Sequence, residues 1–356
     1  MRIKRVLAAL LTAPLVGLSL GAMPTTSTTA QAAPNPALHV DSVTLNKASV
    51  AVSGLNTVPV TATVKGAYNS TSDPDITLYV VLERTAGTGT KVLMVSTNLP
   101  LTAGTLADGT WSGPLNVPST ANGAFKVTGV SAGKYAPGTG DLFDPTPVAN
   151  GPSITVTGTH LPKITAEVIP AVVPFTKDPF RIRWTVTDSS TGKPYGTRLK
   201  LILETDDFCI KYIGPYETDL SDANGVVTKL YGSSVANMSQ CLMLPGDPGA
   251  NGALTIFAPR PGIVAATPSK PSAPVGSLVP VNGSVAGAPW LCPVNLQRLY
   301  GATQWRTVGT STVRTSGRFT LTAQPAYVGQ IPYRVSLPAC KNYRAGVSST
   351  FYVRGL

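Results

Sequence analysis

The stretch VPVTATV at residues 58–64 places an apolar side chain at every second position. Alternation with a period of two is the pattern of a β-strand with one buried face. Short runs of the same kind recur at residues 76–80, 125–127 and 154–156, and none lengthens into a helical period. The chain also contains 34 Gly and 32 Pro, which place turns between short segments. The sequence therefore predicts an all-β protein.

The composition sets limits on the class of protein. Of the 356 residues, 43% are hydrophobic and 13% are charged, enough apolar surface for a packed core and too little charge for a disordered polyelectrolyte. The length allows two or three domains. Turn sequences such as Ala-Asn-Gly at residues 121–123 separate the predicted strands at the spacing of a two-sheet sandwich.

The N-terminal segment predicts export. Residues 1–5 are basic, residues 6–20 are apolar, and Ala30-Gln31-Ala32 supplies the small residues that a signal peptidase cleaves after. A membrane anchor is the alternative, but this apolar run is shorter than the roughly 20 residues that span a bilayer. We expect residues 1–32 to be a signal peptide, and the mature protein to be secreted or at the cell surface without a transmembrane anchor.

Changes in composition predict the domain boundaries. Residues 37–158 form a first sandwich and residues 162–258 a second. Five prolines between Pro259 and Pro274 predict an extended linker over residues 259–274. The third sandwich is then expected over residues 275–356.

Two units resemble known families. In the second unit, residues 186–188 (VTD), 192–194 (GKP) and 221–228 (SDANGVVT) look like the strand-turn-strand pattern of bacterial Ig-like domains of the invasin and intimin kind. In that turn, Asn224 and Gly225 tolerate positive φ, and Asp222 can accept hydrogen bonds from nearby backbone amides.

The third unit resembles an Ig-like or transthyretin-like repeat of secreted actinobacterial proteins, through residues 294–298 (VNLQR), 305–308 (WRTV), 317–321 (GRFTL) and 333–335 (YRV). Both resemblances imply tandem Ig-like β-sandwiches. They imply a fold and no particular activity.

Four cysteines form an even set in a chain with an export signal. Three pairings are formally possible, and we choose Cys209 with Cys241 and Cys292 with Cys340 because each pair stays inside one predicted domain. Closing loops of these lengths stabilises the fold by about 3.7 and 4.1 kcal/mol in the chain-entropy model. A zinc site is the alternative, but the cysteines lack the close spacing of metal ligands.

Charge is distributed unevenly along the chain. Residues 248–356 contain ten Lys and Arg and no Asp or Glu, whereas all 17 acidic residues lie before them. Guanidinium groups pair with phosphate and carboxylate in a bidentate manner. We expect the third unit to bind an anionic envelope polymer or glycan, through arginines on solvent-facing strand positions and loops: Arg298, Arg306, Arg314, Arg318, Arg334 and Arg344.

The positive charge and the aromatic residues of the third unit have other interpretations. The positive charge would also serve solubility alone, and this alternative stays open. Nucleic acid is not an expected partner, because an exported chain meets the envelope first and no nucleic-acid-binding motif is present. A second functional hypothesis is recognition of neutral glycan by exposed aromatic side chains, with Trp290, Tyr300 or Tyr343 as the stacking platform, while Trp305 is expected to be buried.

Catalytic and cofactor motifs are absent from the sequence. The only histidines are His39, near the predicted mature N-terminus, and His160, at a domain joint, so no Ser-His-Asp site is expected. The acidic residues near 206–207 and 217–222 are read as turn residues. Asp141 and Asp144 are weak candidates for calcium ligation. We therefore expect a non-catalytic protein with no cofactor.

The cysteine pairing is directly testable. Peptide mapping of the secreted protein under non-reducing conditions should recover peptides linked through 209/241 and through 292/340. Free thiols, or a link between Cys241 and Cys292, would contradict this assignment.

Overall fold

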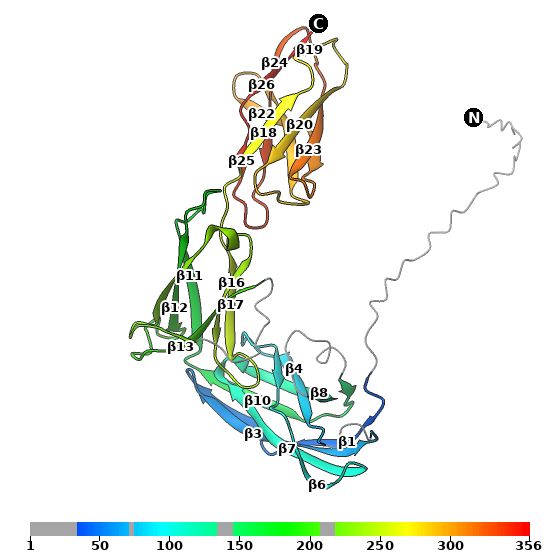
Figure 1. The fold of residues 1–356 in the computed structure, drawn as a ribbon, viewed down its shortest axis with the longest axis vertical. Coiled ribbons are helices and arrows are strands. Elements are labelled where there is room, and N and C mark those ends of the chain that lie inside the picture. The colour runs from blue at the N-terminus through cyan, green and yellow to red at the C-terminus, as the bar shows by residue number, and fades with distance from the viewer. Residues whose placement is uncertain (1–33, 71–74, 134–144, 207–217) are drawn as a thin grey trace, which may run out of the picture.

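A computed structural model describes residues 34–70, 75–133, 145–206 and 218–356, which form a chain of three β-sandwiches (Figure 1). The predicted signal peptide, Cys209, Asp141 and Asp144 lie outside the described residues. In the described parts, helical structure is confined to the short 3₁₀ turns η1 (Ser119–Ala121) and η3 (Ser233–Val235). The predicted all-β fold class is confirmed.

The first sandwich packs two sheets around one core, and their strand pairs are antiparallel except for β2 with β10. One sheet has the order β1 (Leu38–Leu45), β3 (Thr57–Tyr68), β7 (Asp108–Pro118), β6 (Leu101–Thr105). The other has the order β2 (Ser49–Ser53), β10 (Ser153–Thr159), β8 (Gly123–Ala132), β4 (Leu78–Ala86), β5 (Leu93–Val95), with β9 (Thr146–Pro147) beside β8. The stretch at 58–64 lies in β3, where Val60, Ala62 and Val64 are buried and Val58 lies at the rim of the core.

The second sandwich has two smaller sheets. β11 (Pro162–Ile169), β12 (Phe180–Asp188) and β15 (Val226–Tyr231) form one. The other has the order β14 (Thr218–Leu220), β13 (Lys200–Asp206), β16 (Ser239–Leu244), β17 (Gly252–Phe257). Trp184 and Phe180 from β12 are buried between the sheets, as the alternation of this strand requires.

The third sandwich repeats the arrangement. One sheet has the order β18 (Val264–Pro268), β20 (Val279–Val285), β23 (Arg318–Ala323). The other has the order β19 (Ser272–Ala273), β26 (Phe351–Gly355), β24 (Gly329–Leu337), β21 (Pro293–Tyr300), β22 (Gln304–Thr312), with β25 (Gly346–Val347) beside β24.

The predicted linker over residues 259–274 is wrong, because it contains the strands β18 and β19 of the third sandwich. β18 pairs with β20 and lies at the edge of its sheet. An edge strand tolerates proline, because one of its sides makes no backbone hydrogen bonds. Pro268 occupies the last position of β18, and the remaining prolines of the segment lie outside the two strands.

The order of the strands identifies all three units as Ig-like. In each, the first, second and fifth principal strands (A, B, E) form one sheet, and the remaining strands form the other sheet in the order G-F-C-C′. In the first sandwich these are β1, β3 and β7 opposite β10, β8, β4 and β5, with β6 added as strand D. The first and third sandwiches also pair a short strand in parallel with strand G.

The joints between sandwiches are short and packed. Only His160 and Leu161 separate β10 from β11. At this joint the Lys91 ammonium donates to the Ala250 carbonyl at 2.7 Å, and burial lowers the pKa of Lys91 to about 8. Asn116 reaches across the same joint to the carbonyl of Asp247 at 3.0 Å.

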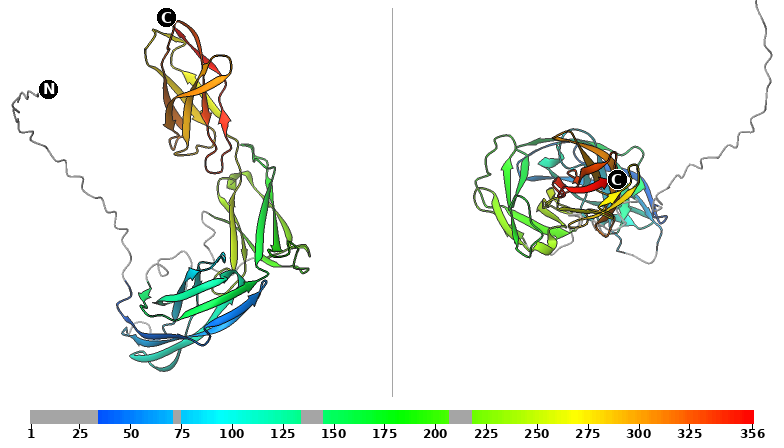
Figure 2. Two further views of the ribbon diagram at one scale, coloured as in Figure 1. Left: turned by 180° about the vertical axis from the view of Figure 1, so that it is seen from behind. Right: turned by 90° about the horizontal axis from the view of Figure 1, so that it is seen from above.

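The joint between the second and third sandwiches is built on Arg260, which is only 5% exposed. Its guanidinium lies 4.2 Å from the ring centre of Phe175 and donates to the carbonyls of Val173 and Pro174. Phe175 also packs on the core of the third sandwich and stacks on Tyr343. The result is an elongated array in which the first sandwich lies at an angle to the other two (Figures 1 and 2).

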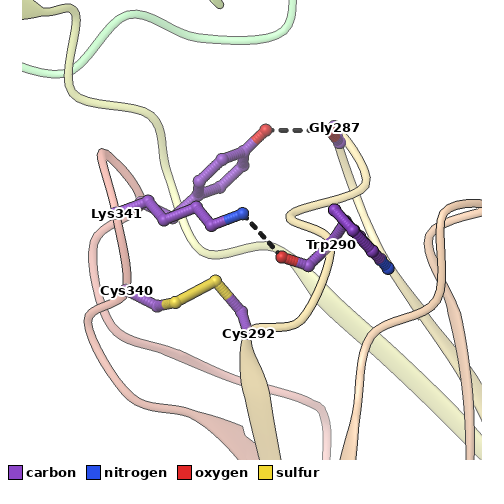
Figure 3. The surroundings of a disulfide bond; sticks show 6 residues. Gly287, Trp290, Cys292, Cys340 and Lys341 are labelled. Atoms are coloured by element: carbon purple, nitrogen blue, oxygen red, sulfur yellow. Dashed lines mark hydrogen bonds between the residues drawn. A yellow bond between two sulfur atoms is a disulfide. The ribbon is translucent and has the colours of Figure 1, made fainter. Parts of the chain in front are cut away.

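The predicted disulfide between Cys292 and Cys340 is present (Figure 3). It joins the residue before β21 to the loop that follows β24, 48 residues later, next to Lys341 and Trp290. Cys241 is buried in β16. Its predicted partner Cys209 lies outside the described residues, so that pairing stays a prediction.

The turn at residues 222–226 has the predicted conformation. Gly225 has a φ of 72°, and the Asp222 carboxylate accepts hydrogen bonds from the amides of Asn224 and Val226. A Cβ on Gly225 would lie 2.3 Å from the Val186 carbonyl oxygen, so this turn packs tightly against β12.

Substitution of Gly225 with Ala should therefore destabilise the second sandwich more than the same change at Gly192. Gly192 has nearly the same φ, 70°, but an added Cβ there meets nothing within 4 Å. We expect Gly192→Ala to cost about 1 kcal/mol from backbone strain, and Gly225→Ala at least about 2–3 kcal/mol from strain and overlap together. Urea denaturation of both variants measures the difference, and equal costs would show that the contact with β12 has no energetic weight.

Candidate anion-binding surface

The six arginines predicted to bind anions do not form one patch. Arg298, Arg306 and Arg334 lie on the β21–β22 hairpin and its neighbour β24. Arg318 is the first residue of β23 in the opposite sheet, and Arg314 lies in the turn before it. Arg344 is at the joint with the second sandwich, where its amide donates to the Arg260 carbonyl. The fold therefore divides the six predicted arginines among three places.

Two arginines share one tyrosine ring on the β21–β22 hairpin. Arg298 and Arg306 are directly opposite each other in the register of the two strands, so their side chains leave the same face. Their guanidinium carbons lie 4.4 and 4.9 Å from the ring centre of Tyr300. Arg298 also donates to the Tyr300 hydroxyl, and Arg306 donates to the Gln304 side chain at 3.0 Å.

Arg334 lies on the other face of the same hairpin. It pairs with Gln297 across β24 and β21, and its Nε donates to the Gln297 side-chain oxygen at 2.8 Å. Its guanidinium carbon is 4.3 Å from the ring centre of Trp305 in β22. We call these five side chains the arginine edge: Arg298, Arg306, Arg334, Tyr300 and Trp305. β22 is the outermost strand of its sheet, so both faces of this edge reach solvent.

The third sandwich itself supplies no carboxylate side chain to neutralise the arginine edge. Residues 248–356 contain no Asp or Glu. The ion pairs found in the described part of the chain, such as Arg183 with Glu167 at 2.8 Å, lie in the first two sandwiches or at their joint. The guanidiniums are held instead by neutral oxygens and aromatic rings, which leaves their charge uncompensated.

Arg314 and Arg318 have a different environment. The Arg314 guanidinium donates to the hydroxyl of Thr320 at 2.7 Å, and Thr320 in turn donates to Asn282. Arg318 is exposed, while its neighbour Phe319 is buried in the core, as the alternation of β23 predicts. This pair carries the same charge as Arg298 and Arg306, but neither of its guanidiniums shows a ring contact in the described residues.

The aromatic residues proposed for neutral-glycan stacking have three different fates. Trp290 is 51% exposed, although the Lys341 ammonium lies 5.9 Å from its ring centre (Figure 3). Tyr343 is only 6% exposed and belongs to the joint with Phe175, so it was wrongly predicted as a stacking surface. Tyr300 has two guanidiniums over its ring.

Trp305 was predicted to be buried, and this prediction is also wrong. It is partly exposed under Arg334 and lies outside the core cluster of the third sandwich. Alternation identifies the buried face only where a second sheet covers the strand, and β22 is an edge strand. No signal in the sequence marks it as an edge.

A shallow depression lies beside Arg334 on the outer face of the sheet. Its walls include the side chains of Asn295, Gln297 and Ser336, together with the apolar residues Leu337 and Val347. The amides and the hydroxyl offer hydrogen-bond donors and acceptors. The depression is open to solvent, so it suits part of an extended polymer rather than an enclosed small molecule.

His160, Asp188 and Ser190 come together, but not as a catalytic triad. His160 Nδ1 is 2.7 Å from Asp188 Oδ2 and 3.1 Å from Ser190 Oγ. A triad requires the serine and the carboxylate on opposite nitrogens of the imidazole. Here both contact the same nitrogen, and the Ser190 hydroxyl donates its hydrogen bond to Asp188 Oδ1 at 2.6 Å. The cluster closes the loop after β12 and holds it against the joint with the first sandwich.

Within the described residues, no three His, Cys, Asp or Glu side chains gather as a metal site. The weak calcium candidates Asp141 and Asp144 lie outside those residues. No helix in the described segments has the length and apolar character needed to cross a bilayer.

Comparison with known proteins finds no matching family model and no matching curated protein. Among solved structures, the chain is similar to the tetra-tandem repeat of a large adhesion protein, with 15% identity over 90% of this chain and 75% of that one and a TM-score of 0.30. It is also similar to the Yersinia pseudotuberculosis adhesin InvE, with 11% identity over 53% of this chain and a TM-score of 0.28.

The D00-D0 domain of intimin shares 12% identity over 54% of this chain and 99% of its own length, with a TM-score of 0.21. The match with InvE spans 58% of that chain. These TM-scores are too low to show a common arrangement of domains. The assignment of Ig-like sandwiches therefore rests on the strand order.

Replacing Asp188 should remove a pH-dependent part of the stability. Hydrogen bonds from the Ser190 hydroxyl, and then from His160 and Thr191, hold the pKa of Asp188 well below its usual range. At a pH between the folded and unfolded pKa values of Asp188, its carboxyl binds a proton in the unfolded chain but not in the folded chain. This stabilisation is therefore complete above about pH 4 and is lost as the pH falls further.

We expect Asp188→Asn to lower the melting temperature at pH 7, and this deficit should shrink towards pH 2. The exposed Asp178 of the same sandwich is the matched control, and Asp178→Asn should change neither the stability nor its pH profile. Parallel profiles for wild type and Asp188→Asn between pH 2 and 7 would contradict the assignment.

Proposed function

We propose that this chain is an extracellular, non-catalytic protein of tandem Ig-like sandwiches whose third sandwich attaches it to an anionic envelope polymer. The observation that carries the proposal is the arginine edge. It presents two guanidiniums opposite each other over one tyrosine ring, in a unit without a single carboxylate side chain.

The placement of Arg298 opposite Arg306 has an electrostatic cost. Like charges directly opposite on neighbouring strands repel each other, and the face of Tyr300 offsets only part of that repulsion. An anion bound between Arg298 and Arg306 would remove the repulsion. Phosphate and carboxylate both fit, because each accepts two parallel hydrogen bonds from a guanidinium.

The arrangement of the array supports this role. The third sandwich occupies one end of the molecule, and the first two sandwiches extend away from it (Figures 1 and 2). All the acidic residues precede the third unit. An anionic polymer is therefore attracted to one end of the molecule, which leaves the other two sandwiches available as a spacer or an adhesive surface.

Neutral glycan is the second candidate ligand, and the exposure of Trp290 favours it. A sugar ring could stack on the indole at the joint with the second sandwich. Binding of this kind depends little on ionic strength, whereas pairing with phosphate weakens steeply with salt.

Binding of the full mature chain to poly(glycerol phosphate) tests the proposal. We expect affinity to fall as salt rises, and Arg298→Gln with Arg306→Gln to weaken binding about tenfold at low salt and to flatten the salt dependence. Titration calorimetry at a series of salt concentrations measures both effects.

Arg314→Gln with Arg318→Gln is the matched control, because it removes the same charge from the opposite sheet. It should cost clearly less than the first pair. Equal losses would mean that net charge alone attracts the polymer, and no loss from either pair would leave the charge as a determinant of solubility. Salt-independent binding to a neutral polysaccharide that Trp290→Ala abolishes would favour the second candidate.

A further inference from the structure

Apolar side chains gather at the end of the third sandwich farthest from the second. β19 ends and β24 begins at this end (Figure 1). The loop from β19 to β20 exposes Leu278, at 70%, together with Val275, and the loop before β24 exposes Val328, at 72%, together with Tyr327. We call these four side chains the apolar tip.

The two loops of the apolar tip are joined to each other. The Gly276 amide donates to the Pro325 carbonyl at 2.9 Å, and the Gln324 side chain donates to the Gly276 carbonyl at 2.8 Å. Both loops flank Gly355, where an added Cβ would lie 2.0 Å from the Tyr327 carbonyl oxygen and 3.3 Å from Val275 Cγ2. The exposed side chains therefore belong to one surface, held on a rigid framework.

The arginine edge borders this surface. The Tyr333 hydroxyl donates to the Gln324 carbonyl in the loop of the tip, and the Arg298 side chain bonds to Tyr333. Burial raises the pKa of Tyr333, the guanidinium of Arg298 opposes this rise, and Tyr300 and Tyr327 add to it. Arg354 lies one residue before Gly355 and is exposed. Apolar residues thus occupy the tip, with guanidiniums and tyrosine rings around it.

We propose that the apolar tip inserts into the interfacial region of an anionic lipid bilayer while Arg298, Arg306 and Arg354 pair with lipid phosphates. This inference goes beyond the proposed function, with which it shares the arginine edge, by adding a lipid surface to the anionic polymer as a ligand. Apolar side chains that enter the acyl boundary, surrounded by cationic and aromatic residues at headgroup level, are the combination that binds peripheral proteins to membranes.

The charge selects a bilayer over a second copy of the chain. Two tips in contact would bring together two third sandwiches, each with nine Lys and Arg in residues 264–356 and no carboxylate side chain. Like charges juxtaposed in this way oppose association. An anionic bilayer buries the apolar tip and pairs with the guanidiniums at the same time.

Sedimentation with vesicles tests the inference on the full mature chain. Vesicles of phosphatidylglycerol and phosphatidylcholine should bind the protein, and vesicles of phosphatidylcholine alone should bind it weakly. Leu278→Ser with Val328→Ser should weaken binding to the anionic vesicles at least about tenfold, and that loss should persist at high salt. In Tyr327→Trp, lipids brominated on the acyl chain should quench fluorescence beyond the quenching seen in wild type.

Leu230→Ser with Val92→Ser is the matched control, because these residues form an exposed Leu and Val pair, at 58% and 57%, in the other two sandwiches. It should leave vesicle binding unchanged. The inference would be overturned if the tip variant bound vesicles as tightly as the wild type. It would also be overturned if the wild type bound poly(glycerol phosphate) but not vesicles, which would assign the tip to another partner such as a protein. In both cases the proposed function survives if Arg298→Gln with Arg306→Gln still weakens polymer binding, and it fails only if that pair has no effect.

Discussion

Burial of every second side chain between two sheets is the constraint on which this structure depends. Each sandwich satisfies it with a core of its own, built around Trp111, Trp184 or the pair Phe319 and Tyr333. Because a strand has only two faces, the same alternation directs polar and charged residues outwards. The surface chemistry of the third unit therefore follows from its core, since burying Tyr333 and Val335 leaves Arg334 on the outer face.

The second constraint operates between the sandwiches. Each joint is short, and the residues that complete it come from distant parts of the chain. Arg260 illustrates this point. It comes from the unit that lacks acidic residues, yet it is buried against Phe175 and satisfied by two carbonyls of the second sandwich. Packing of this kind turns separate domains into one extended body and sets the direction in which the third sandwich points.

The absence of carboxylates in the third unit gives its surface an unusual energetic character. In the second sandwich, the cations Arg183 and Lys229 have acidic partners. In the third, guanidiniums rest on Tyr300 and Trp305, which attract a cation without cancelling its charge. The surface stays both positive and aromatic next to an apolar tip, so electrostatic attraction and apolar contact act at one end of one domain.

The sequence by itself determined the fold class, the turn at Asn224 and Gly225, and the pairing of Cys292 with Cys340, because these depend on local period, backbone preference and the presence of both cysteines in one domain. It also determined the excess of arginine over acid. Only the tertiary structure decided that the segment 259–274 is folded, that Tyr343 and Arg260 are buried at a joint, and that Trp305 is partly exposed. The tertiary structure also placed Arg298 and Arg306 in one sheet and Arg318 in the other. The physical reason is that period two distinguishes the two faces of a strand but does not specify which strand lies at an edge, or which loops meet across a joint.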